Sequence, residues 1–159
     1  MKQAHIDKHT IAWFKIAECV SRGEKERALG VYRLLSYSFN DMAVALQLEA
    51  DIYFSFFEQE QAIVLYHQAM DLYQKSERYL EAAAVCEHLI TMRPHDLLLR
   101  REVIKLYHPL GLEAKMRMHI QKIVDTIFLT GNELSLQEFL AVLRTYSDEL
   151  YEYGVACLK

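Results

Sequence analysis

Histidine pairs and adjacent acid–histidine residues are the parts of this 159-residue sequence whose types could do chemistry. His5 and His9 stand four residues apart, a spacing that could present two imidazoles to one metal ion from the same face of a helix. No acidic third ligand follows them at a motif spacing. We therefore expect this segment to be a solvated helix face that holds no metal.

Two further pairs, Glu87-His88 and His95-Asp96, place an acid directly beside a base. Adjacent residues of a helix point about 100° apart, so neither pair can act together on one substrate atom. The glycine-rich phosphate and dinucleotide motifs, the zinc-protease motif and the serine-nucleophile motif are all missing from the sequence. We expect no catalytic residue, no cofactor and no enzymatic activity.

Three cysteines, Cys19, Cys86 and Cys157, are far apart and form no C-x-x-C motif. They are expected to be small buried apolar residues rather than disulfide partners or zinc ligands. Charged residues at close intervals in the first thirty positions interrupt any signal-peptide core, and no uncharged apolar run of about 18 residues occurs. These features predict a cytoplasmic protein that does not enter the membrane.

The elements that position these residues are all expected to be helices. Hydrophobic residues make up 52% of the chain, with only five Gly and two Pro, and they recur at helical spacing. We predict one all-α domain, 1–159, of about eight helices. The predicted landmarks are an N-terminal helix over 3–21, N-caps at Asp41 and Asp96, helix ends at Pro94 and at 109–111, and a C-terminal helix over 135–153 opened by a Ser135/Glu138 capping box.

A 34-residue echo runs through this helical pattern. Ala28 and Tyr32 recur one period later as Ala62 and Tyr66, and Tyr73 recurs as Tyr107 at the same offset. A small residue lets two helix axes approach, and an aromatic ring above it fills the groove between them. The two sets of matches agree in period but not in phase, so they leave open which helix comes first in each pair.

The segment "YLEAAAVCEHLITMRPHD" resembles the second helix of a tetratricopeptide repeat, with Tyr79, Ala82 and Pro94 where that family places an aromatic, a small residue and proline. The resemblance implies a short right-handed α-solenoid of TPR-like helix pairs over roughly 28–128, with 135–153 as its capping helix. It also implies an adaptor or scaffold that binds proteins. A small chaperone or assembly factor for a secreted or complex-forming client, and a structural homo-oligomer subunit, remain as alternatives.

Charge is divided unevenly along the sequence. Between Arg33 and Lys75 there are six acidic residues and no Lys or Arg, whereas 93–122 holds seven basic residues against three acids. A basic or mixed-charge protein segment is therefore the expected partner, with Gln47, Asp51 and Phe54 as its contacts. Ordinary solvated faces, or head-to-tail contact in a homodimer, would explain the same pattern. Nucleic acid is not an expected partner, because the chain is acidic and its basic segment lacks interleaved aromatics.

Overall fold

Every regular element that the computed structural model describes, in residues 8–130 and 133–158, is an α-helix. The contacts cluster in two compact units, Met1–Ser76 and Glu77–Lys159. The single domain expected from the sequence stays a prediction. Within the described residues, no helix has the length and apolar content needed to cross a bilayer. The all-α prediction is thereby confirmed, and the described part of the chain holds nine helices rather than about eight.

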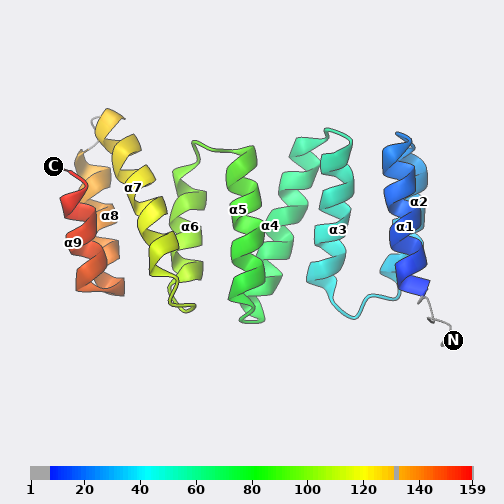
Figure 1. The fold of residues 1–159 in the computed structure, drawn as a ribbon, viewed down its shortest axis with the longest axis horizontal. Helices are drawn as coiled ribbons and strands as arrows, with labels where there is room; N and C mark the ends of the chain where they lie inside the picture. The colour runs from blue at the N-terminus through cyan, green and yellow to red at the C-terminus, as the bar shows by residue number, and fades with distance from the viewer. Residues whose placement is uncertain (1–7, 131–132, 159) are drawn as a thin grey trace, which may run out of the picture. The chain divides into compact units, whose positions relative to one another are not determined.

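The N-terminal unit consists of two helix pairs in which each helix packs on the next (Figure 1). Its helices are α1 Lys8–Ser21, α2 Lys25–Ser36, α3 Met42–Ser55 and α4 Gln59–Lys75. Ala28 and Ala62, the small residues of the 34-residue echo, have no exposed surface. An alanine at these positions leaves room for the neighbouring helix, which a larger side chain would hold away.

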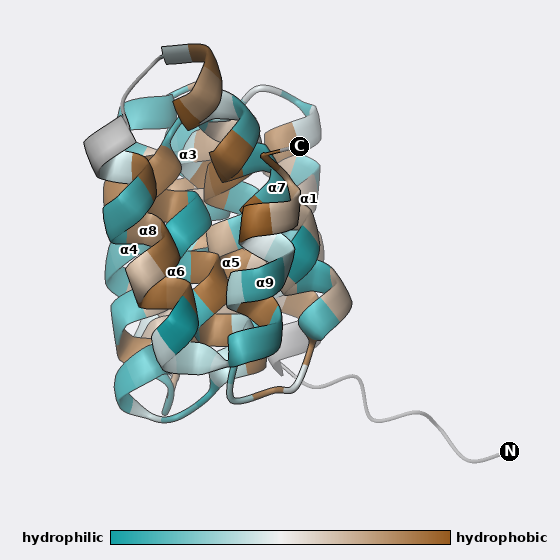
Figure 2. Ribbon diagram, turned by 90° about the vertical axis from the view of Figure 1, so that its left-hand side faces the viewer, coloured by the Kyte–Doolittle hydropathy of each residue, from teal (hydrophilic) through white to brown (hydrophobic). Residues whose placement is uncertain are grey.

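The C-terminal unit contains a run of helices in which α5 packs on α6, α6 on α7, and both α8 and α9 on α7. Its helices are α5 Tyr79–Met92, α6 Leu97–Tyr107, α7 Glu113–Thr130, α8 Glu133–Tyr146 and α9 Asp148–Ala156. Figure 2 shows hydrophobic and hydrophilic bands alternating around these helices. A Cβ added to Gly154 would come within 2.9 Å of both Leu140 and Leu143, so glycine lets α9 pack closely on α8.

Both predicted aspartate N-caps are confirmed. Asp41 Oδ1 accepts from the backbone N–H groups of Ala43 at 3.0 Å and Val44 at 3.3 Å. Asp96 Oδ1 accepts in the same way from two backbone N–H groups of α6, at 2.9 and 3.2 Å. These bonds satisfy donors that a helix start otherwise leaves without partners, and so they fix where α3 and α6 begin.

The predicted C-terminal helix 135–153 is wrong in both its start and its continuity. Helix α8 already begins at Glu133, so Ser135 lies inside the helix and is not its cap. The chain then breaks at Ser147, whose extended backbone carries a side chain that accepts from the Leu150 N–H at 3.1 Å. That cap starts a new helix, α9. Residues 3–7 of the predicted N-terminal helix lie outside the described residues.

Four residues with positive φ explain the conflict of phase in the sequence. In the N-terminal unit they are Gly23 (φ 73°) and Phe57 (φ 62°), and in the C-terminal unit Glu77 (φ 57°) and Gly111 (φ 64°). The two members of each pair are separated by the period of the echo, whereas Phe57 and Glu77 lie closer together than one period. A turn of the same kind therefore recurs after one period within each unit. The repeat of the C-terminal unit is out of phase with the repeat of the N-terminal unit.

Glycine in these turns and glycine inside a helix should respond in opposite ways to the same substitution. Gly111→Ala should lower the free energy of unfolding by about 1 kcal/mol, because alanine is strained at positive φ. Gly30→Ala, inside α2 where an added Cβ meets nothing within 4 Å, should raise it by about 0.5–1 kcal/mol. Urea unfolding measures both, and changes of the same sign would contradict this account of the turns.

Candidate functional site

Buried tyrosine hydroxyls organise the polar contacts between helices. Tyr32, Tyr66, Tyr73 and Tyr107 are the tyrosines of the 34-residue echo, and each is at most 7% exposed. Every one of them donates its hydroxyl to an acidic or amide side chain of another helix. The acceptors are Glu49 for Tyr32 (3.1 Å), Asp51 for Tyr66 (2.5 Å), Gln47 for Tyr73 (2.8 Å) and Glu87 for Tyr107 (2.6 Å).

The burial of these rings explains why each hydroxyl has an acceptor. A phenol placed in a helix contact loses its water, and an unsatisfied hydroxyl there costs on the order of 1–3 kcal/mol. Burial raises the pKa of Tyr66, and its hydrogen bond to Asp51 raises that pKa further. Burial likewise raises the pKa of Tyr32, as does the charge of Glu49. Both hydroxyls therefore stay protonated and act as donors.

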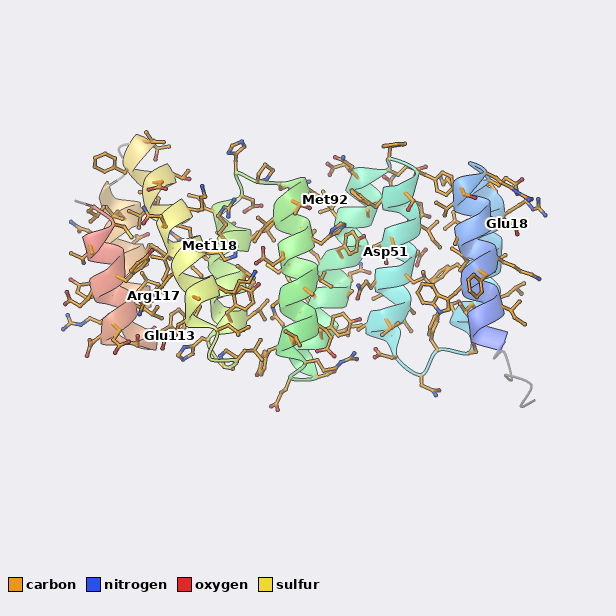
Figure 3. The ribbon with its side chains drawn as sticks, viewed as in Figure 1. Glu18, Asp51, Met92, Glu113, Arg117 and Met118 are labelled. Atoms are coloured by element: carbon orange, nitrogen blue, oxygen red, sulfur yellow. The ribbon has the colours of Figure 1, made fainter. Side chains whose placement is uncertain are left out.

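The structure gives two of the three predicted partner-binding residues an internal role. Gln47, Asp51 and Phe54 share one face of α3, as their helical spacing requires (Asp51 is labelled in Figure 3). Gln47 and Asp51 accept from the tyrosines of α4, while Phe54 is half-buried. Nothing in the structure tests their role in binding, so that role stays a prediction, but both polar side chains already hold α4 against α3.

The acidic stretch of the sequence is also largely engaged within the N-terminal unit. Asp41 caps α3, Glu49 and Asp51 accept from tyrosines, and Glu58 pairs with Lys25. Glu60 also has an interaction, so at least five of its six acids have intramolecular partners. These acids therefore already serve contacts within the unit, and whether a basic partner is drawn to the stretch stays a prediction.

A buried acid–histidine contact lies in the C-terminal unit, and sequence reasoning missed it. His119 of α7 is 1% exposed, and its Nε2 lies 3.0 Å from Glu87 Oε1 on α5. The same oxygen accepts the Tyr107 hydroxyl. Glu87 and His119 lie far apart in the sequence, so no local motif reveals them, whereas the adjacent pair Glu87-His88 drew attention to the wrong histidine.

The electrostatics of this cluster indicate a structural contact. Burial lowers the pKa of His119, although Glu87 acts in the opposite direction. Burial alone would raise the pKa of Glu87, but the hydrogen bonds from Tyr107 and His119 outweigh it and hold that pKa below its ordinary value. Arg100 Nη1 lies 3.5 Å from His119 Nδ1, and because a guanidinium only donates, Nδ1 is the acceptor. Both ring nitrogens of a neutral His119 are therefore occupied.

An open apolar groove lies between α1 and α2 of the N-terminal unit. It encloses about 410 Å³. Two large apolar side chains that line it, one from each helix, are strongly exposed, with Ile11 at 44% and Leu34 at 78%. The groove is lined by Ile11, Ala12, Lys15, Val31, Leu34, Leu35 and Ser38. Because large exposed apolar patches are common at interaction surfaces, the groove is a candidate site.

A second, more polar hollow of about 240 Å³ continues this groove toward the α1–α2 turn and shares Lys15 and Val31 with it. Its acids are both paired, since Arg22 bonds Glu18 at 2.6 Å and Arg27 bonds Glu24 at 2.7 Å (Glu18 is labelled on α1 in Figure 3). We call the two hollows together the α1–α2 groove. In the sequence, Ile11 and Lys15 are four residues apart, and Val31 and Leu34 are three apart, so each pair shares one helix face. The sequence analysis assigned only one apolar stripe to each helix and therefore did not identify this second face.

The histidine pair and the three cysteines are the remaining residues that the sequence analysis considered. His5 lies outside the described residues, so the His5/His9 pair is not placed. Among the residues that the structure describes, no three His, Cys, Asp or Glu side chains are grouped so as to hold a metal ion. Cys19 and Cys86 are buried as expected, whereas Cys157 is only half-buried.

Comparison with protein-family models, curated proteins and solved structures finds no match for this chain. The case for function therefore depends on the geometry of the sites alone.

The buried histidine should make the C-terminal unit sensitive to acid. Because the folded-state pKa of His119 lies below its unfolded value of about 6.5, its contribution to stability is complete above that pH and is lost as the pH falls. The lowered pKa of Glu87 acts in the same direction at lower pH. Urea unfolding measures the free energy of unfolding at pH 7.5 and at pH 5. Between these two pH values, that free energy should fall less for His119→Gln than for the wild type, and an equal fall would contradict this assignment.

Proposed function

We propose that this chain is a protein-binding module, an adaptor or assembly factor made of TPR-like helix pairs, with no chemistry of its own. The observation that carries the proposal is the α1–α2 groove. Ile11 of α1 and Leu34 of α2, which line it, leave apolar surface in water at 44% and 78% exposure. Covering that surface would be favourable by roughly 25 cal/mol per Å² of apolar area.

The shape of the groove favours a protein over a small molecule. Small-molecule sites are concave and bury most of their ligand, with a few polar groups converging on it. Leu34, which lines this groove, is instead 78% exposed. A surface this open is covered well only by a ligand that extends beyond it, such as a segment of another protein.

The polar cluster of the C-terminal unit supports a non-enzymatic function. A general base needs a free nitrogen or oxygen within reach of substrate. Both ring nitrogens of His119 are engaged, and Glu87 Oε1 accepts two hydrogen bonds. The positive-φ turns that recur at the period of the echo in each unit support the TPR-like part of the proposal.

The test of this proposal is a matched pair of surface substitutions. Leu34→Glu places a charge in the groove, whereas Leu98→Glu makes the same change at a similarly exposed leucine of α6, 73% against 78%. In quantitative affinity capture, a partner of the groove should be retained by the wild type and by Leu98→Glu and lost at least tenfold with Leu34→Glu. Because both leucines are exposed, neither change should lower the free energy of unfolding by more than about 0.5 kcal/mol.

The opposite result is as clear. If both variants and the wild type retain the same proteins in the same amounts, the α1–α2 groove is not the binding surface. If the captured protein is the chain itself, and sedimentation shows self-association that only Leu34→Glu abolishes, the homo-oligomer alternative replaces the adaptor.

A further inference from the structure

Lys15 is the charged side chain at the centre of the α1–α2 groove. Lys15 lines both hollows of the groove. The apolar hollow also includes Ile11, and the polar hollow also includes Arg22. The other charged side chains that line the groove form ion pairs with one another. Within the part of the chain that the structure describes, Lys15 makes no hydrogen bond or ion pair.

We propose that the α1–α2 groove binds an acidic amphipathic helix of a partner protein, with the apolar face of that helix on Leu34 and Ile11 and one of its carboxylates on Lys15. This inference rests on the proposed function and specifies the partner. An apolar helix that covered the groove would remove water from Lys15, and an ammonium group without water or a counter-charge is costly. A carboxylate in the partner offsets that cost.

The backbone chemistry of α1 and α2 selects a helix over an extended segment. Along the groove, both helices use their own N–H and C=O groups internally, so they offer no edge with which a strand could pair. An extended segment would bury its own peptide groups against Leu34 and Val31 without partners. A helix satisfies its backbone groups internally and can pack as a third helix beside the pair.

The acids of the groove are already in ion pairs, which favours a different protein as the partner over a second copy of this chain. In an isologous contact, each Lys15 would meet the same surface of the other copy. The acids there are Glu18 and Glu24, which already pair with Arg22 and Arg27. A partner that brings its own unpaired carboxylate is the better complement.

The dimensions of the groove fix the pattern of the partner. Ile11 lies on α1 and Arg22 follows directly after its end, eleven residues on, which corresponds to about 16 Å, or three helical turns. Lys15 lies one turn from Ile11. The partner helix should therefore carry apolar residues at i and i+3 or i+4, with Asp or Glu about one turn further on.

A displayed library of 16-residue amphipathic helices provides the probe. Its apolar face is fixed with leucines, and its polar positions vary among Asp, Glu, Gln, Lys and Arg. The library is selected against the full chain and against three variants, Lys15→Glu, Leu34→Glu and Lys75→Glu. Lys75 is an exposed lysine at the end of α4, so its substitution changes the net charge equally outside the groove.

The inference expects the wild type and Lys75→Glu to select an acid at one polar position, and Lys15→Glu to select Lys or Arg there. An acidic peptide so selected should bind Lys15→Glu about three- to tenfold more weakly than it binds the wild type, and Lys75→Glu within twofold. Leu34→Glu should lose binding to all of these peptides.

Failure of this inference differs from failure of the proposed function. Peptides that bind the wild type and are lost with Leu34→Glu, but show no charge preference that depends on Lys15, overturn the acidic partner and leave the protein-binding groove in place. If no peptide is selected, or if the selected peptides bind Leu34→Glu as tightly as the wild type, both the acidic partner and the groove are overturned.

Discussion

A tyrosine ring that fills a helix contact must find an acceptor for its hydroxyl, and the helix pairs of this protein depend on that constraint. Tyr66 and Tyr73 lie on one face of α4, two turns apart, and their acceptors Asp51 and Gln47 lie one turn apart on α3. Two bonds between the same pair of helices fix how far one can slide along the other. Nonspecific apolar packing alone would leave that register less well determined.

The same constraint accounts for charge that would otherwise suggest a binding surface. Glu49 and Asp51 serve tyrosines of the N-terminal unit, and Glu87 of the C-terminal unit serves both Tyr107 and His119. Acids used in this way are held by these contacts and are not free to reorient toward a partner. The α1–α2 groove differs because Ile11 and Leu34, together with Lys15, stay exposed there, which is why the proposed function is placed there.

Local signals in the sequence predicted most of the fold. Apolar spacing located the helices, and Asp41 and Asp96 marked two starts, because a cap is an interaction between residues two or three apart. The break at Ser147 was missed because it interrupts a continuous helical pattern. The candidate site was harder to predict, since contacts such as His119 with Glu87 join residues far apart in sequence. The charge pattern of the sequence located the acids near Asp51, but it could not show that tyrosines of other helices donate to them.

A double-mutant cycle of Tyr66→Phe and Asp51→Ala tests this account most directly. Urea unfolding of the wild type, the two single variants and the double variant gives the coupling free energy between the two side chains. The account predicts a coupling of about 1 kcal/mol or more, because a buried hydroxyl donates to a charged acceptor. A coupling within about 0.3 kcal/mol of zero would contradict it. It would show that Asp51 is not committed to Tyr66.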